Sequence, residues 1–111
     1  MLIQNYQGYG RYCYRISPKS KRNIGYFELW SYPNKNEIWS LRIIESQHNK
    51  GYGTRMLQEF LNDYKENKPL YLYVYKDNEI AIKLYEKVGF VIVGEYSKYA
   101  WTMQYMGTKR R

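Results

Sequence analysis

Residues Gln47–Tyr64 read Q-H-N-K-G-Y-G-T-R-M-L-Q-E-F-L-N-D-Y, a glycine-containing loop followed by an amphipathic stretch. In the second half, apolar residues recur at the spacing that fills one face of a helix, and they are Met56, Leu57, Phe60, Leu61 and Tyr64. Just upstream, Glu37–Glu45 (E-I-W-S-L-R-I-I-E) is rich in apolar and β-branched residues, which is typical of a strand. The sequence therefore predicts a unit of strand, glycine turn and helix.

The glycine loop stands where a helix can bind an anion. Backbone N–H groups in the first turn of a helix have no partner within it, and the helix dipole places partial positive charge there. Gly51 and Gly53 carry no side chain, so a phosphate could approach the backbone closely. Lys50 and Arg55 add positive charge on either side. An ordinary strand-to-helix connection also uses glycine for its turn, so this loop alone leaves both interpretations open.

A second junction of this kind occupies Asn78–Phe90, N-E-I-A-I-K-L-Y-E-K-V-G-F, after the apolar run Leu70–Tyr75. Asp77 is expected to cap this helix, and Gly89 to end it in a left-handed conformation. The expected buried stripe consists of Ile80, Ala81, Leu84 and Val88. Because a strand-helix-strand crossover joins parallel strands, Leu70–Tyr75 is expected to lie parallel to Glu37–Glu45.

The remaining segments predict a mixed, mostly antiparallel sheet. Further strands are expected at Tyr9–Ile16, Ile24–Tyr32, Phe90–Tyr96 and Tyr99–Met106. The resulting order, β-β-β-α-β-α-β-β, is an α/β (α+β) fold with two helices. We expect a single domain over residues 1–111, since a chain of this length supports one core.

Composition narrows the class of protein. A hydrophobic fraction of 44% and a charged fraction of 25% are those of a globular protein. We expect a cytoplasmic protein, because there is no membrane-length apolar run, no signal-peptide pattern and only one cysteine. The net charge of +8 favours anionic partners such as nucleic acid, an acidic protein surface or a phosphorylated cofactor. One Cys and one His cannot build a metal-ligand cluster, so no metal is expected.

The two junctions together resemble the GNAT superfamily of acetyl-CoA-dependent N-acetyltransferases. Its first signature, (Gln/Arg)-x-x-Gly-x-Gly/Ala, is similar to H-N-K-G-Y-G at His48–Gly53. Its second, Asn-x-x-Ala-x-x-x-Tyr-x-x-x-Gly-Phe, is similar in register to Asn78, Ala81, Tyr85, Gly89 and Phe90. The run K-G-Y-G-T is especially like the histone-lysine branch. The resemblance extends over residues 37–106, and it implies the GNAT-like sheet described above.

The resemblance implies that acetyl-CoA is the acetyl donor. The pyrophosphate would bind mainly to backbone N–H groups of the loop, which comprises His48, Asn49, Lys50, Gly51, Tyr52, Gly53 and Thr54. His48 replaces the usual Gln or Arg, and its ring can donate one hydrogen bond as glutamine does. Pantetheine and the acetyl carbonyl would bind main-chain atoms of Ile43, Ile44 and Glu45. Asn78 would lie near the pantetheine arm, although a helix-capping role explains it equally well.

Tyr85 is the expected general acid. It lies one residue beyond the predicted buried stripe, so its ring can lean toward the cleft. By resemblance, its family counterpart stands near the cofactor sulfur and protonates the departing thiolate. Among 15 tyrosines, simple packing is the alternative, and spacing alone would favour it.

Glu37 is the expected general base. It begins its strand at the separation from His48 at which the histone-lysine branch places its catalytic glutamate. Burial in a partly apolar cleft is expected to raise its pKa and so improve it as a base. Glu28 and Glu45 are alternates. Cys13 is interpreted as a core residue rather than a nucleophile, because no histidine lies near it in the sequence.

The start of the chain departs from the family pattern. The usual first strand and the two helices after it have no room before Tyr9, and Met1–Gln7 supplies at most a short strand. In the family these helices wall one side of the acceptor site. We therefore expect an open cleft, covered by a large acceptor or by a second subunit in a homodimer.

Two functions from different classes follow. The first is transfer of acetyl to a primary amine, which could be a protein lysine or N-terminus, a small amine or an aminoacyl-tRNA. The net charge favours an anionic macromolecule as acceptor. The alternative is a GNAT-fold module that binds coenzyme A or nucleic acid and has lost catalysis. The intact Tyr85 and glycine loop favour the enzyme, whereas His48 and the short start favour the binding module.

Overall fold

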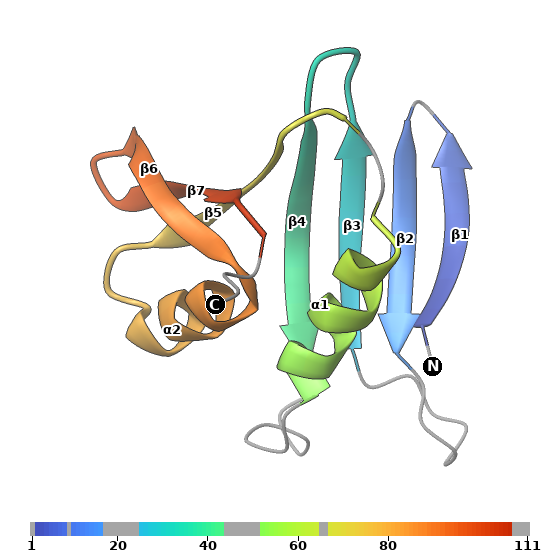
Figure 1. Ribbon diagram of the computed structural model, residues 1–111, viewed down its shortest axis with the longest axis horizontal. Coiled ribbons are helices and arrows are strands. Elements are labelled where there is room, and N and C mark those ends of the chain that lie inside the picture. Colours follow the sequence, from blue (N-terminus) through green and yellow to red (C-terminus); the bar gives the residue numbers. More distant parts are fainter. Residues whose placement is uncertain (1, 9, 17–24, 44–51, 65–66, 108–111) are drawn as a thin grey trace.

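The computed structural model describes residues 2–8, 10–16, 25–43, 52–64 and 67–107 (Figure 1). Within them, seven strands form one sheet in the order β1-β2-β3-β4-β5-β7-β6, and two helices accompany it. The elements are β1 (Leu2–Gly8), β2 (Arg11–Ile16), β3 (Gly25–Ser31), β4 (Asn36–Ile43), α1 (Tyr52–Asn62), β5 (Leu70–Tyr75), α2 (Glu79–Val88), β6 (Phe90–Ser97) and β7 (Ala100–Tyr105).

The pairing of the strands confirms the predicted mixed, mostly antiparallel sheet. β4 and β5 are parallel, as expected for strands joined through α1, and the other neighbours are antiparallel. The exception to the prediction is β1, a full strand where at most a short one was expected. Its sequence alternates poorly, but it pairs with β2 from Leu2↔Ile16 to Gly8↔Arg11, and this ladder satisfies the backbone groups on that side of the strand.

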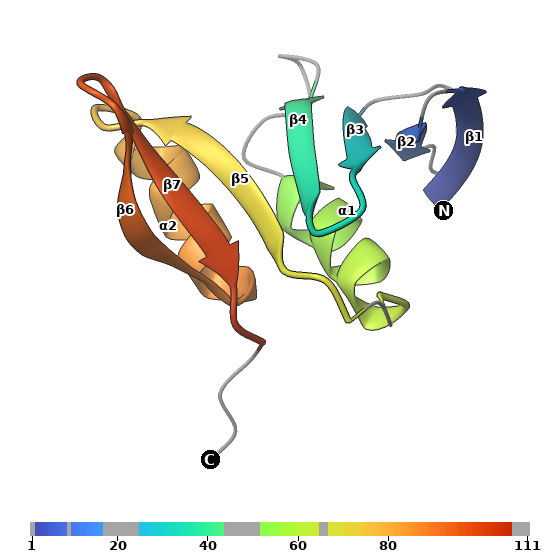
Figure 2. The ribbon, with the colours of Figure 1, turned by 90° about the horizontal axis from the view of Figure 1, so that it is seen from above.

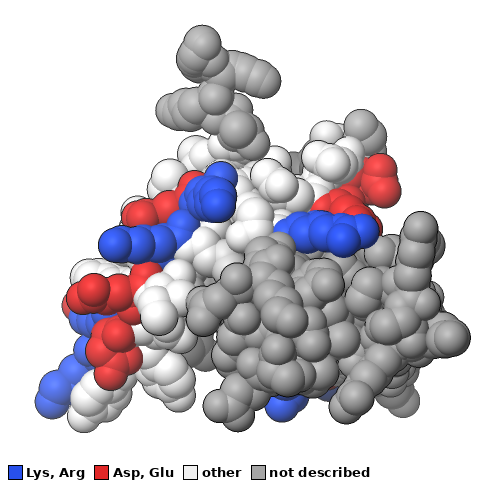
Figure 3. All heavy atoms as spheres, turned by 90° about the horizontal axis from the view of Figure 1, so that it is seen from below, with Lys and Arg blue, Asp and Glu red and all other residues white. Residues whose placement is uncertain are grey.

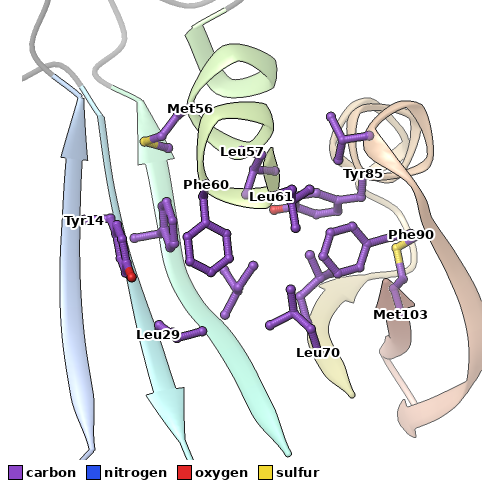
Figure 4. Packing of buried hydrophobic residues seen from close by; sticks show 14 of the residues in the cluster. Tyr14, Leu29, Met56, Leu57, Phe60, Leu61, Leu70, Tyr85, Phe90 and Met103 are labelled. Carbon is purple, nitrogen blue, oxygen red and sulfur yellow. The ribbon is translucent and has the colours of Figure 1, made fainter. Parts of the chain in front are cut away.

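The apolar stripe of α1 forms the core of the molecule, as predicted. Met56, Leu57, Phe60 and Leu61 are buried, and Tyr64 is partly buried. Phe60 meets the aromatic rings of β2 and β3 edge-on, at centroid distances of 4.9 Å from Tyr14 and 5.3 Å from Phe27. Figure 4 shows this stripe pointing from α1 toward the sheet and toward α2. The helix is thus fixed on the sheet by packing rather than by its own propensity.

Three predictions for α2 can be compared with the structure. The cap is Asn78 rather than Asp77, because the Asn78 side chain accepts from the Ala81 N–H at 3.2 Å. Ile80 is 82% exposed, so its place in the buried stripe was wrong. Val88 is buried, and Ala81 and Leu84 are partly buried against the core, as predicted. The other buried residue of the helix is Tyr85, which was placed outside the predicted stripe.

Gly89 ends α2 in the left-handed conformation that was predicted, with φ 115°. A Cβ atom at this position would lie 2.9 Å from a ring carbon of Tyr105 and 3.0 Å from the backbone of Gly107. Any side chain would therefore be strained twice, by the backbone conformation and by contact. This close approach seats the β6–β7 hairpin against the end of α2.

Both helices lie on the same face of the sheet, as the view in Figure 2 shows. Strand alternation sends Phe27, Leu29, Ile38 and Leu72 toward them, and these residues belong to the buried core. The residues between them point to the opposite face. That face therefore carries the partly buried rings of Tyr26, Trp30, Trp39 and Tyr73.

Charged side chains are intermixed on the face shown in Figure 3. Where that face is described, Lys and Arg side chains lie beside Asp and Glu side chains. On α1, Arg55 forms an ion pair with Glu59 at 3.3 Å. Among the described residues, neither helix is long and apolar enough to span a membrane.

Candidate active site

The parallel strands β4 and β5 diverge after only three residue pairs. Their pairing runs from Asn36↔Leu70 to Ile38↔Leu72, and no further pair is formed in the described parts of the two strands. We call this divergence the fork. A β-bulge on β4 accompanies it, because two residues between Trp39 and Arg42 stand opposite one residue of β3. Ser40, in the bulge, has φ 59°, and a bulge of this kind bends its strand.

A cleft of about 510 Å³ occupies the fork. Backbone groups that face the gap beyond Ile38 and Leu72 can there pair with a ligand instead of a neighbouring strand. Residues of four elements line the cleft, and they include Trp39 and Ser40 of β4, Tyr73 of β5, Asn78 and Tyr85 at α2, and Tyr96 of β6.

Tyr85 lines this cleft from the helix side of the sheet. Figure 4 shows its ring projecting from α2 toward Leu57 and Leu61 of α1. It is 9% exposed, so it belongs to the buried stripe rather than lying one residue beyond it. Burial raises the pKa of Tyr85 to about 12. The phenol is therefore fully protonated at neutral pH and is a proton donor next to the fork.

Glu37 lies just before the fork, on the face opposite the helices, and is 5% exposed. Its Oε1 accepts from the Trp39 indole N–H at 2.7 Å. Its Oε2 accepts from the Tyr73 hydroxyl at 2.7 Å and pairs with the Lys35 ammonium at 3.1 Å. Burial alone would raise the pKa of Glu37, but these three donors outweigh it and hold the pKa below its ordinary value. The expectation of a raised pKa was therefore wrong.

Glu28, an alternate for the base, sits in a nearly identical arrangement one strand away. Its Oε2 accepts from the Tyr26 hydroxyl at 2.6 Å, and its Oε1 accepts from the Trp30 indole N–H at 2.8 Å. These hydrogen bonds, with nearby Arg11 and Arg42, lower the pKa of Glu28. The sequence E-L-W at 28–30 and the sequence E-I-W at 37–39 thus build the same structure, which we call the Glu-x-Trp unit.

A row of aromatic rings crosses the sheet on this face and ends at the cleft. Successive ring centroids are 5.1 Å apart from Trp30 to Trp39, 5.1 Å from Trp39 to Tyr73, and 4.2 Å from Tyr73 to Tyr96. The Arg11 guanidinium lies 4.0 Å from the centroid of the Trp30 ring at the far end. At the near end Trp39, Tyr73 and Tyr96 line the cleft.

The predicted coenzyme-binding residues are only partly described. Tyr52, Gly53 and Thr54 form the first turn of α1, where free backbone N–H groups are expected, and Gly53 is buried. Ile43 is the last residue of β4 and pairs with Gly25. Asn78 lines the cleft and also caps α2. Ile44, Glu45, His48, Asn49, Lys50 and Gly51 lie outside the described residues.

Cys13 and several cleft residues complete the comparison with the sequence predictions. Cys13 is buried, as predicted, and its Sγ lies 3.3 Å from the Tyr26 hydroxyl. The predictions missed Trp39, Tyr73 and Tyr96. The repeated Glu-x-Trp pattern was the available signal for Trp39, whereas no local pattern marks the other two. No group of metal-binding side chains occurs in the part of the chain that the structure describes.

Comparison with known proteins gives a consistent picture. N-alpha-acetyltransferase RimI of Mycobacterium tuberculosis is 34% identical over 67 residues, 60% of this chain and 42% of that protein. A probable spermine N(1)-acetyltransferase of Bacillus subtilis subsp. natto is 34% identical over 77 residues, 64% of this chain and 51% of that protein. The chain thus spans about half the length, or less, of these curated relatives.

A solved structure shows the same fold. The ribosomal-protein-S18-alanine N-acetyltransferase from Escherichia coli superposes with a TM-score of 0.76 at 17% identity, covering 94% of this chain and 74% of that one. The family model described as the acetyltransferase (GNAT) family matches residues 3–90, which include the fork and both helices. The chain therefore belongs to the acetyltransferase (GNAT) family.

Proposed function

We propose that the protein is an N-acetyltransferase that transfers the acetyl group of acetyl-CoA to a primary amine. One observation carries the proposal: Tyr85, a buried phenol that keeps its proton, lines a cleft between two diverging strands. The same tyrosine stands in the second signature of the family. A proton donor at a backbone-lined fork is what a thioester and an amine need in order to exchange an acyl group.

The donor would enter from the helix side. The first turn of α1 offers backbone N–H groups to an anion, and the missing side chain at Gly53 lets a phosphate approach. The predicted loop residues 48–51 precede this turn. From there the fork supports an extended arm between β4 and β5, with Asn78 on its lining. The cleft has a volume of about 510 Å³, which is typical of small-molecule sites.

In the proposed reaction the amine nitrogen attacks the acetyl carbonyl carbon, and the carbon–sulfur bond breaks. Tyr85 gives its phenolic proton to the departing sulfur. The nitrogen, which becomes acidic as the amide forms, returns a proton to the phenolate oxygen. The products are an amide and a thiol, and Tyr85 ends in its starting state. A phenol with a pKa of about 12 requires this return, because it does not persist as phenolate.

The proposed acceptor is a primary aliphatic amine. Related proteins are named for the α-amine of a ribosomal protein and for spermine, which share only that group. An anionic macromolecule carrying such an amine remains our proposal from the net charge of +8.

Calorimetric titration of acetyl-CoA tests the donor site. Gly53→Glu should weaken binding by about 100-fold or more, because a carboxylate would occupy the anion-binding turn of α1. Gly94→Glu is the control for the added charge alone: it places the same carboxylate on β6, where a Cβ atom meets nothing within 4 Å, whereas Gly53 is buried. Equal binding by the two variants would contradict the assignment of the turn. Binding without turnover of any amine would favour the coenzyme-binding module instead.

A further inference from the structure

The two Glu-x-Trp units differ in the origin of their tyrosine. In the first unit Tyr26 belongs to the same strand as Glu28. In the second, Tyr73 belongs to β5 and reaches Glu37 on β4. Backbone pairing of these strands ends at Ile38↔Leu72, one residue before Tyr73. The hydrogen bond from Tyr73 to Glu37 therefore links the two arms of the fork at the position where the ladder stops.

We propose that Glu37 is a positioning residue that fixes the opening of the fork. It holds Trp39 on one arm and Tyr73 on the other, and these rings, together with Tyr96, form an aromatic wall on which the apolar part of the acceptor rests. The proposal rests on the proposed acetyltransferase function and assigns a different role to Glu37 from that of a general base.

The contacts of Glu37 support positioning. Both carboxylate oxygens already accept hydrogen bonds, and Oε2 also pairs with Lys35. The carboxylate of Glu37 acts on the cleft through Trp39 and Tyr73, the two hydrogen-bond partners that line it. A carboxylate whose pKa is lowered by its donors is also a weak base toward an ammonium. The same construction around Glu28, away from the fork, shows that this chain uses the unit to fix aromatic rings.

The position of the aromatic wall indicates that it contacts the acceptor rather than acetyl-CoA. By strand alternation with the buried Ile38 and Leu72, Trp39 and Tyr73 lie on the face opposite α1 and α2. The proposed donor site lies at the helix side. Tyr96, which is 55% exposed, extends the wall outward from the cleft. Two substrates that enter from opposite faces can meet in the fork without competing for space. Aromatic surfaces provide apolar contact and also tolerate a nearby cation.

This assignment changes how the amine loses its proton. Transfer of an ammonium from water into a cleft lined by rings and aliphatic side chains lowers its pKa by desolvation. The first proton then leaves to bulk water before attack, and the second follows the route through Tyr85 described above. No protein carboxylate has to change its charge during the reaction.

Nuclear magnetic resonance of the tryptophan indole N–H groups tests the network itself. Tyr73→Phe should shift the Trp39 indole resonance and speed its exchange with solvent, because Glu37 loses a donor and becomes mobile. Glu28→Gln should move the Trp30 resonance and leave that of Trp39 in place. An unchanged Trp39 resonance in Tyr73→Phe would overturn the proposal. This measurement needs no substrate, so it stands even where the proposed function fails.

Turnover separates a positioning role from a base. With acetyl-CoA as donor and an alanyl tripeptide or spermidine as acceptor, Glu37→Gln should raise the acceptor KM by about 3- to 10-fold and lower kcat by less than about 10-fold, since one hydrogen bond is lost. Tyr73→Phe should change the acceptor KM and kcat to a similar extent. The double variant should have about the same KM and kcat as the less active of the two single variants, because both substitutions break the same network. The pH dependence of kcat/KM should keep the same ascending limb in all three.

A general base would give a different pattern. Glu37→Gln would then lower kcat by about 100-fold or more and remove the ascending limb, while Tyr73→Phe would be nearly silent. Either result overturns the positioning role. Tyr96→Ala should raise the acceptor KM by about 5-fold or more while the acetyl-CoA affinity is unchanged. An unchanged KM for both acceptors would remove the wall from the acceptor site. Glu28→Gln is the control, because it makes the same substitution in the equivalent Glu-x-Trp unit of β3, away from the fork.

Discussion

The two Glu-x-Trp units, at 28–30 on β3 and at 37–39 on β4, have the same local geometry and different neighbours. In each, one carboxylate holds an indole and a phenol on the face opposite the helices. Glu28 gathers its partners within β3, inside a continuous part of the sheet. Glu37 stands where the sheet opens, and one of its partners comes from the next strand. The same arrangement of hydrogen bonds therefore lies within one strand around Glu28 and joins the two strands of the fork around Glu37.

The difference shows how a short pattern acquires a use from its place in the fold. A bulge with Ser40 at φ 59° follows the second unit, and the pairing of β4 with β5 ends just before it. Trp39 and Tyr73 therefore come from adjacent strands whose backbones are no longer paired at this position, and their ring centroids are 5.1 Å apart. Neither unit presents a carboxylate with a raised pKa. This difference supports our proposal that the proton donor is Tyr85, whose pKa is raised by burial.

The largest expected effect follows from this placement. Tyr85→Phe should lower kcat by about 100-fold or more, because it removes the proton donor for the departing sulfur. Acetyl-CoA affinity should remain within about 3-fold, since the ring itself is retained. Steady-state kinetics and calorimetry measure the two quantities. Tyr105→Phe is the matched control, because Tyr105 packs on the same Phe90 ring as Tyr85 does.

An outcome that moves binding and turnover together would contradict this role. If Tyr85→Phe weakened acetyl-CoA binding as much as it lowered kcat, Tyr85 would only shape the cleft. If it changed neither quantity while Glu37→Gln abolished turnover, proton transfer would belong to the second Glu-x-Trp unit. Our assignment of proton donation to Tyr85 and of positioning to Glu37 would then be wrong.

The two units should also differ in what they contribute to folding. Glu37→Ala should lower the free energy of unfolding by about 3 kcal/mol, because it removes a buried carboxylate that accepts from a partly buried indole and a partly buried phenol and pairs with an ammonium. Glu28→Ala should cost about 1 kcal/mol, because Glu28 is more accessible and water can replace it. Urea denaturation gives both values. Equal losses of unfolding free energy in the two variants would mean that the position of Glu37 at the fork adds nothing to its contribution to stability.

The sequence allowed much of the fold to be predicted because its signals are local. The stripe of α1 repeats with helical spacing, and Gly89 marks the end of α2. The predicted stripe of α2 was right for Val88 and wrong for Ile80, which is exposed, while Tyr85 is buried; both side chains are apolar enough to be core. Spacing does not decide between them. Contact with α1 and Phe90 does.

The site was harder to predict, because it depends on where strands part. Tyr85 could be recognised from a motif, and the structure places it at the cleft. Trp39, Tyr73 and Tyr96 come from three strands and meet only after the sheet has formed. The pKa of Glu37 could not be predicted for the same reason. Burial was foreseeable from its strand, but the hydrogen bond from Tyr73 requires the register of β4 against β5.

The smallest predicted effect concerns acid. Because the pKa values of Glu28 and Glu37 are lowered in the folded protein, each stabilises it above the ordinary glutamate pKa of 4.5. That stabilisation is lost as the pH falls from this value through the lowered, folded-state pKa. The free energy of unfolding of the wild type should therefore fall with decreasing pH by at most about 1.4 kcal/mol per pH unit for each group.

Glu37→Gln and Glu28→Gln sharpen the comparison, because each removes one titrating group and should flatten this acid slope. Urea unfolding curves between pH 3 and 7 measure it. A slope in Glu37→Gln that matches the wild type would mean that Glu37 titrates alike in the folded and unfolded chains. Its donors would then not outweigh burial, and the case for a carboxylate base would return. A slope that steepens would mean a raised folded-state pKa, since protonation would then stabilise the fold of the wild type.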